Sequence, residues 1–197
     1  MIILASSSPR RRELLSMIGL TYTIETSGEE EVQPHGLPPA EFVKTLALQK
    51  AQPIADKYPQ DCVIGADTIV YLEGDILGKP HTPEVAKAYL RRMQGKSHVV
   101  YTGVAVLKNG KADVRHCETK VTFAPMTERE IDAYVATEEP LDKAGAYGVQ
   151  GPGGVFVERV EGNYFNVIGL PLPMLYKMLI DAGEVVLPVV EEHAVEE

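Results

Sequence analysis

The spacing of apolar positions along the chain changes between the two-residue period of strands and the longer period of helices. Apolar or β-branched runs predict strands at 1–5, 21–26, 62–66, 99–107, 112–123 and 155–160. Apolar positions three and four residues apart predict helices at 9–18, 38–57, 127–137 and 171–182, and another that begins after Thr82. This mixture of strands and helices indicates the α/β fold class.

Signals for helix starts and turns support several of these boundaries. Ser8 is suited to the N-cap of the first helix because Pro9 follows it at the first helical position. Thr127 and Glu130 have the spacing of a capping box. The Asn-Gly pair at 109–110 is a strong hairpin signal.

Three places interrupt the regular pattern. Pro53 lies inside the helix predicted at 38–57 and is expected to kink or end it nearby. The apolar run 62–66 is expected to break at Asp67-Thr68, before a separate hairpin that presents Gly78-Lys79-Pro80. A glycine-rich loop is expected at 138–154.

Length and composition indicate an ordinary globular chain. It has 197 residues, of which 45% are apolar and 24% are charged, so we expect one domain over 1–183 and an acidic, frayed tail over 184–197. Cys62 and Cys117 have no metal-ligand spacing and are expected to be free thiols. Free thiols indicate a reducing compartment, so the expected location is the cytoplasm. The N-terminus does not resemble a secretory signal, and no apolar run approaches the roughly 18 residues of a membrane span.

The formal net charge of -9 restricts the binding partners. It argues against broad, sequence-independent binding to nucleic acid or to an anionic membrane. An anionic ligand would therefore be bound in a local pocket.

The first candidate for such a pocket is the segment SSSPRRR at 6–12, between a predicted strand and a helix. Hydroxyls, guanidinium groups and the free N–H groups of a helix N-terminus are the groups that bind a polyphosphate. A solvated basic helix face is the alternative. The position favours an anion site, because cations at a helix N-terminus oppose the helix dipole and call for a compensating anion.

Asp67 is the second candidate, because it ends the predicted buried strand CVIGA. Ligands of open α/β sheets bind outside the carboxyl ends of the strands, where a carboxylate can act as a general base or metal ligand. A turn-forming or helix-capping Asp is the commoner role for a single Asp-Thr pair.

The remaining candidates carry weaker signals. The acidic run 29–31 supplies hard oxygen ligands for Mg²⁺ or Mn²⁺, although a solvated charge run is the stronger interpretation. Lys79 is either a phosphate contact or a surface turn lysine. In the loop 142–151, Tyr147 offers an aromatic face and Gln150 a donor and acceptor pair. The five histidines show no ligand spacing.

Five blocks of sequence, read together, resemble the Maf family of nucleotide pyrophosphatases. They are LASSSPRRRELL at the start, GADTIV at 65–70, GKP at 78–80, YVATEEPLDKAGAYGVQG at 134–151 and NVIGLPL at 166–172. The resemblance covers the chain from Ile2 to about Gly183. It implies a mixed, twisted sheet with flanking helices and two lobes around a central cleft, similar to the inosine triphosphatase fold.

The resemblance also implies an activity and a set of site residues. The activity is hydrolysis of a nucleoside triphosphate between the α and β phosphates, with a divalent cation and with Asp67 as proton acceptor. The matching substrate contacts are Ser6, Ser8, Arg10, Arg11, Lys50 and Lys79. The matching metal ligands are Glu30 and Glu31, together with Asp67. The expected partner is the nucleotide alone, and a homodimer is compatible with the sequence.

Substrate choice follows from three marker positions of the family. The members that act on dTTP and UTP carry Arg, Thr and Gln there, which match Arg10, Thr68 and Gln150. Hydrolysis of 7-methyl-GTP ranks second, because the corresponding members carry other residues at these positions. A non-catalytic regulator of cell division is the alternative outside enzymology. The small departures are Gln49, where relatives often carry an acid, and the acidic tail.

Overall fold

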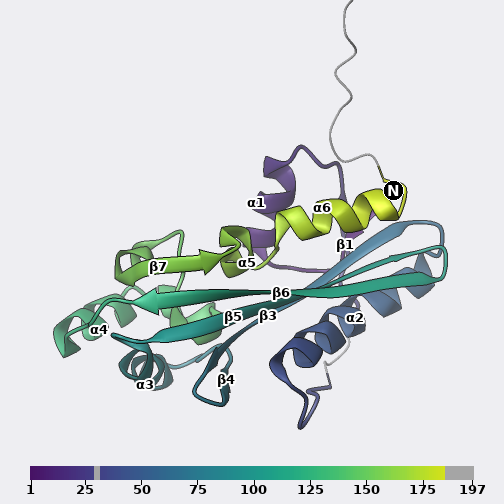
Figure 1. Cartoon of the computed structure of the whole chain (residues 1–197). Coiled ribbons are helices and arrows are strands. Elements are labelled where there is room, and N and C mark those ends of the chain that lie inside the picture. The colour runs from purple at the N-terminus through teal and green to yellow at the C-terminus, as the bar shows by residue number, and fades with distance from the viewer. Residues whose placement is uncertain (29–31, 185–197) are drawn as a thin grey trace, which may run out of the picture.

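The computed structural model describes residues 1–28 and 32–184 as one long sheet with helices packed against it (Figure 1). The strands are β1 (Ile2–Leu4), β2 (Thr23–Ile24), β3 (Cys62–Leu72), β4 (Asp75–Leu77), β5 (Ser97–Lys108), β6 (Lys111–Phe123) and β7 (Val157–Gly162). The helices are α1 (Pro9–Met17), α2 (Pro39–Lys57), α3 (Pro83–Met93), α4 (Glu128–Val135), α5 (Tyr164–Ile168) and α6 (Leu172–Asp181). Short 3-10 turns, η1 (Glu139–Asp142), η2 (Ala144–Ala146) and η3 (Pro152–Phe156), occupy the expected glycine-rich loop.

The sheet is mixed and runs in the order β2-β1-β3-β5-β6-β7, with β4 paired to β3. β1 pairs in parallel with β2 and β3, whereas β3, β5, β6 and β7 are joined by antiparallel pairing. The long strands β3, β5 and β6 run the length of the molecule (Figure 1). The mixed α/β fold class expected from the sequence is therefore confirmed.

Alternation along the strands separates the two faces of the sheet. Helix α2 covers one face through an apolar cluster that includes Ala47, Val63 and Ala105. On the other face, α1 and α6 pack at one end of the sheet, while α3 and α4 pack at the other. Short α5 lies between these groups against β5 and β6, and the buried Asn166 side chain donates to the Val100 carbonyl at 3.0 Å.

Several predicted turns and caps are confirmed. β5 and β6 are joined through Asn109 and Gly110, both at positive φ, as the hairpin signal requires. The capping box of Thr127 and Glu130 is formed in both directions. Ser8 occupies the N-cap of α1, but its side chain makes no capping hydrogen bond.

Other boundaries were predicted wrongly. α2 spans the predicted range to Lys57, but it does not end near Pro53, because Ala51 and Ile54 stay buried in the core and outweigh the backbone hydrogen bond that proline cannot make. β3 does not break at Asp67-Thr68, since β5 pairs with it without a shift from Val63 to Tyr71. Of the strand expected at 21–26, only β2 forms, and α5, capped by Asn163, was not predicted.

The predicted acidic tail falls mostly outside the described residues. Glu184, its first residue, accepts a hydrogen bond from Lys108 Nζ at 2.7 Å, and residues 185–197 are not described. Cys62 and Cys117 are both free, as expected. Within the described part of the chain, no helix has the length and apolar character that a membrane span requires.

Candidate active site

Two cavities share part of their lining, and the first of them lies beside β3. The first has a volume of about 650 Å³ and the second about 810 Å³, a size range typical of small-molecule sites. The residues that line both are Ser8, Arg10, Arg11, Lys50 and Lys79. Four of these five side chains are cationic, so a protein of net charge -9 gathers positive charge where the two cavities meet.

An open stretch of strand edge explains why the first cavity forms here. On the side of β3 opposite β5, β1 pairs with residues 62–64 and β4 pairs with residues 70–72. Within the described chain, no strand pairs with residues 65–69 on that side. The Ile64 carbonyl accepts from the Ala5 N–H at 2.8 Å, so by alternation the peptide groups of Ala66 and Thr68 face the same opening.

Asp67 lies in the middle of this open stretch and not at the carboxyl end of a strand, which corrects the predicted placement. Its carboxylate forms an ion pair with Lys50 Nζ of α2, and the two side chains are 14% and 20% exposed. The pair depends on close approach of α2 to the sheet. A Cβ atom at Gly65 would overlap the Ala47 carbonyl oxygen, and one at Gly103 would overlap that of Val43.

Arg11 is buried and links distant segments around the site. Its Nε donates to the Gly169 carbonyl at 2.9 Å, one terminal nitrogen donates to Ser6 Oγ at 3.2 Å, and the other donates to Thr68 Oγ1 at 3.1 Å. The guanidinium group therefore fixes α1 against β3 and the turn after α5, while it also lines both cavities.

The serine loop, residues 5–8 between β1 and α1, places further polar groups at the second cavity. Buried Ser6 accepts from the Ser8 N–H at 3.2 Å through its Oγ atom. Arg10 is half-buried and Lys79 is exposed. Burial opposes ionisation of Asp142, but its hydrogen bond to Lys143 and the charges of Lys143, Arg10 and Lys79 hold its pKa below the usual range. The charges of Arg10 and Lys79, which belong to separate segments, thus both lower the pKa of Asp142.

Thr68 and Gln150 both line the first cavity, whose remaining wall includes Val70, Val100 and Val167. Thr68 Oγ1 lies 3.0 Å from Thr102 Oγ1 across the β3–β5 pair. Gln150 is exposed. Tyr147 also lines this cavity, but its ring is buried against Phe123 and its hydroxyl lies 2.8 Å from His98 Nε2. The Tyr147 ring, predicted from the sequence as a face for a ligand, therefore packs mostly against core residues.

The predicted metal ligands are only partly described. Glu30 and Glu31 lie outside the described residues, while Gly28 and Val32 on either side of them line the second cavity. The Gln49 side chain accepts from the Val32 N–H at 3.0 Å and donates to its carbonyl at 3.1 Å. A carboxylate at position 49 could not donate to the Val32 carbonyl. The Gln49 amide therefore makes a hydrogen bond that the acid found in relatives could not make. Within residues 1–28 and 32–184, no group of three or more His, Cys, Asp or Glu side chains could hold a metal ion.

Glu139 and Lys143 line the first cavity and were not predicted as site residues. Lys143 Nζ donates to the Glu139 carbonyl and to Asp142 Oδ1, both at 2.8 Å. The signal that points to Glu139 is the run of glycines at 148–154, because a Cβ atom at Gly148 or Gly151 would meet its Oε1 atom. The sequence shows those glycines, but it does not show what approaches them.

Comparisons with known proteins agree with this architecture. A solved structure titled the Staphylococcus aureus Ham1 protein is similar with a TM-score of 0.53 over 93% of this chain and 99% of that one. At 13% identity, the likeness concerns the fold alone.

Relatives with much higher sequence identity cover nearly the whole chain. A protein of Moorella thermoacetica named dTTP/UTP pyrophosphatase is 51% identical over 92% of this chain and 95% of its own length. A protein of Pelotomaculum thermopropionicum with the same name is 52% identical over 94% of this chain and 98% of its own. The family model described as Maf-like protein matches residues 1–182. The chain therefore belongs to the Maf family.

Proposed function

We propose that this protein hydrolyses dTTP and UTP to the nucleoside monophosphate and pyrophosphate. The observation that carries the proposal is the junction of the two cavities, where four cationic side chains meet beside the Asp67 carboxylate. The name dTTP/UTP pyrophosphatase, shared by the relatives from Moorella and Pelotomaculum, supports the substrates.

In this proposal the triphosphate lies across the junction. Ser8, Arg10 and Lys79 bind its oxygens, and they contribute a hydroxyl and two cations from separate segments. Ser6 and Arg11 support this loop, and Arg11 also brings its charge to the cavity wall. Positive charge held in place before the reaction stabilises the charge that develops as the phosphorus–oxygen bond breaks.

Asp67 acts on the water that attacks the α-phosphorus. Its carboxylate orients the water and accepts one of its protons, while the bond to the bridging oxygen breaks and pyrophosphate leaves. Lys50 supports this role because its ammonium group fixes the carboxylate within the cavity wall.

The Asp67 carboxylate is a ligand of the kind that Mg²⁺ and Mn²⁺ bind. Such ions bind through one or two carboxylates together with substrate phosphate oxygens, so Asp67 with Glu30 or Glu31 would be sufficient to hold one. The cavity lining at Gly28 and Val32 supports the assignment of the acidic run. When bound, the ion neutralises charge on the phosphates.

Base choice is assigned to Gln150 and Thr68 of the first cavity, with Arg10 as the third specificity residue. Uracil and thymine present an N3–H donor between two carbonyl acceptors. A Gln amide in one orientation accepts from N3–H and donates to O4, while the flipped amide would suit cytosine.

Incubation with dTTP and Mg²⁺ tests the proposal. We expect dTMP and pyrophosphate in equal amounts, and ¹⁸O from labelled water in the monophosphate. Label in released orthophosphate would instead show γ-phosphate cleavage and contradict the proposal. A panel that includes UTP, CTP and 7-methyl-GTP measures the substrate preference in the same assay.

A further inference from the structure

Both ends of the segment 148–153, which carries Gln150, are held by two side chains that are hydrogen-bonded to each other. Glu139 Oε2 accepts from the Gly153 N–H at 3.0 Å and from the Tyr134 hydroxyl at 2.7 Å. The Tyr134 oxygen in turn accepts from the Gly148 N–H at 3.2 Å. We call Glu139 and Tyr134 the loop clamp.

Close contact between the loop clamp and the segment explains the glycines. A Cβ atom at Gly151 would overlap Glu139 Oε1, and one at Gly153 would overlap the Tyr134 hydroxyl. Neither glycine has a positive φ, so close approach and not backbone conformation requires glycine here. The segment therefore lies directly on the clamp over most of its length.

The clamp itself is held by the core. Tyr134 is 3% exposed on α4 and its ring lies 5.5 Å from that of Phe156. Burial raises the pKa of Tyr134 well above its usual value, and the hydrogen bond to Glu139 raises it further, so the hydroxyl stays protonated. It can therefore donate to Glu139 and accept from Gly148 at every working pH.

We propose that Glu139 and Tyr134 are positioning residues for base selection, which hold Gln150 so that its amide presents one orientation to the nucleotide base. The proposal rests on the proposed function and adds to it. Gln150 by itself cannot reject cytosine, because a flipped amide pairs equally well with that base. Discrimination therefore requires that the amide be held in one orientation, and the loop clamp fixes the backbone on both sides of Gln150, from which that side chain extends.

Three substrates separate base selection from catalysis. They are dTTP, CTP and deoxyribose 5-triphosphate, which has no base. In Glu139→Ala and in Tyr134→Phe, we expect the ratio of kcat/KM for dTTP to that for CTP to fall by roughly 5 to 150-fold, the usual effect of an unpaired buried polar group. We expect kcat/KM for the base-free triphosphate to be unchanged.

Matched variants distinguish positioning from loss of stability. Glu139→Gln keeps a carbonyl that accepts both hydrogen bonds, and should restore the wild-type ratio. Glu130→Ala destabilises the same helix through its capping box, without contact with the segment, and should also keep that ratio. In a Gln150→Ala background, Glu139→Ala should cause no further fall in the ratio, because both changes act through one side chain.

Two results would overturn the inference. One is an equal fall for all three substrates in Glu139→Ala and Tyr134→Phe, which would make the clamp structural only. The other is an unchanged ratio in both variants. If Glu139→Ala does not fold, Tyr134→Phe decides. Wild-type protein that does not cleave dTTP between the α and β phosphates would refute the proposed function, and the inference with it. Cleavage with unchanged variant ratios would refute the inference alone.

Discussion

At the scale of single residues, the Asp67 carboxylate is held within a continuous strand and is not placed on a flexible turn. Its position in β3 is fixed by strand pairing on one side, and its side chain is fixed by Lys50. A group held in this way needs little reorganisation when a water molecule is bound beside it.

Asp67→Asn should lower kcat for dTTP by roughly 10² to 10⁴-fold, the usual contribution of a positioned acid–base group. The amide has nearly the same shape, so folding should be preserved. Initial rates of pyrophosphate release measure the effect. Asp132→Asn serves as the control, because Asp132 lies on the surface of α4 in an ion pair with Lys87. Wild-type turnover by folded Asp67→Asn would remove Asp67 from the mechanism.

His98 provides a test of stability against pH. Burial lowers the pKa of His98 from 6.5 to about 4, and its Nδ1 atom has no hydrogen-bond partner. The unfolded chain therefore binds a proton between these values and the folded chain does not, so stability is complete above pH 6.5 and falls toward pH 4. Between pH 7 and pH 5, the free energy of unfolding should fall by about 2 kcal/mol through this group.

Urea unfolding of wild type and His98→Gln at pH 7 and pH 5 measures that contribution. The variant lacks the titrating group, so its stability should depend less on pH. The same pH dependence in both proteins would show that His98 does not cause it.

The sequence could predict which residue types gather at the site, but not how they are held. Ser8, Arg10 and Lys79 line the junction as a phosphate site requires, and they carry local signals in the serine loop and the GKP turn. The hydrogen bond from Arg11 to the Gly169 carbonyl joins residues 158 positions apart, and no local pattern indicates such a contact. The loop clamp joins residues only 5 to 14 positions apart, but the glycines at 148–153 do not show which side chain lies against them.

At the scale of elements, the approach of α2 to the sheet sets the position of Lys50. Gly65 and Gly103 leave room for the helix backbone directly above β3 and β5. Lys50 lies one turn along α2 from Leu46 and reaches Asp67, two residues beyond Gly65. Packing at the glycines and the geometry of the ion pair are therefore coupled.

Gly65→Ala should damage both stability and turnover. The added Cβ atom would overlap the Ala47 carbonyl oxygen and lie 2.8 Å from the Ala51 Cβ, so α2 must shift. We expect a loss of about 1–3 kcal/mol in the free energy of unfolding and a lower kcat as Lys50 moves away from Asp67. Urea unfolding and pyrophosphate release measure the two effects.

Ile54→Val is the matched control. It removes a methylene group from α2, whereas Gly65→Ala adds a methyl group that displaces the helix. It should cost about 0.5–1.5 kcal/mol and leave kcat unchanged. Equal kcat in Gly65→Ala and wild type would show that the helix position does not govern the ion pair.

The elements were predictable where local chemistry dominates and less so where pairing across the sheet decides. The hairpin at Asn109-Gly110 and the capping box of α4 follow from residues within a few positions of each other. The continuity of β3 through Asp67 depends on β5, more than thirty residues later in the chain, where Thr102 lies opposite Thr68. Burial of Ile54 similarly outweighs Pro53.

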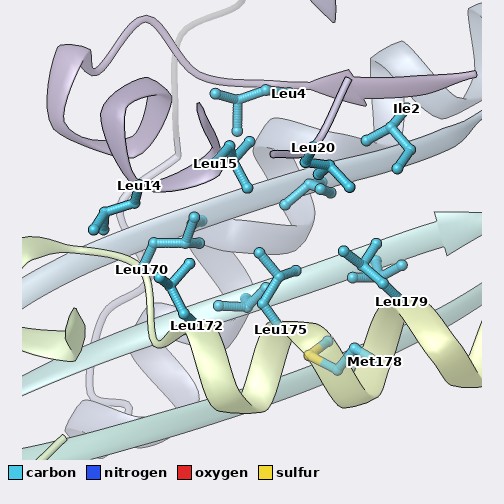
Figure 2. Packing of buried hydrophobic residues seen from close by; sticks show 14 of the residues in the cluster. Ile2, Leu4, Leu14, Leu15, Leu20, Leu170, Leu172, Leu175, Met178 and Leu179 are labelled. Carbon is cyan, nitrogen blue, oxygen red and sulfur yellow. The ribbon is translucent and has the colours of Figure 1, made fainter. Parts of the chain in front are cut away.

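At the scale of the whole molecule, the two ends of the described chain share one apolar core. Leu172, Leu175 and Met178 of α6 face Leu4 of β1 and Leu15 of α1 (Figure 2). Leu4 precedes the serine loop that connects β1 to α1, and Leu15 follows it. The first strand and helix are therefore supported by α6.

Leu175→Ala tests this support. Leu175 is fully buried, so its truncation should lower the free energy of unfolding by roughly 2–5 kcal/mol. Ile180→Ala removes an exposed side chain of the same helix and should change it by less than about 0.5 kcal/mol. Thermal or urea unfolding compares the two, and equal losses would contradict the assignment of α6 to the core.

This shared core has a consequence for the growing chain during translation. The serine loop and Arg10 are made among the first residues, yet α6, which packs with Leu4 before that loop and with Leu14 and Leu15 after it, is made after β7 and α5. Gly169, whose carbonyl accepts the hydrogen bond from Arg11 Nε, is also made late. A nascent chain that ends before α6 therefore holds every basic residue of the proposed phosphate site without the core that supports β1 and α1, so we expect nucleotide binding to begin only when α6 has left the ribosome.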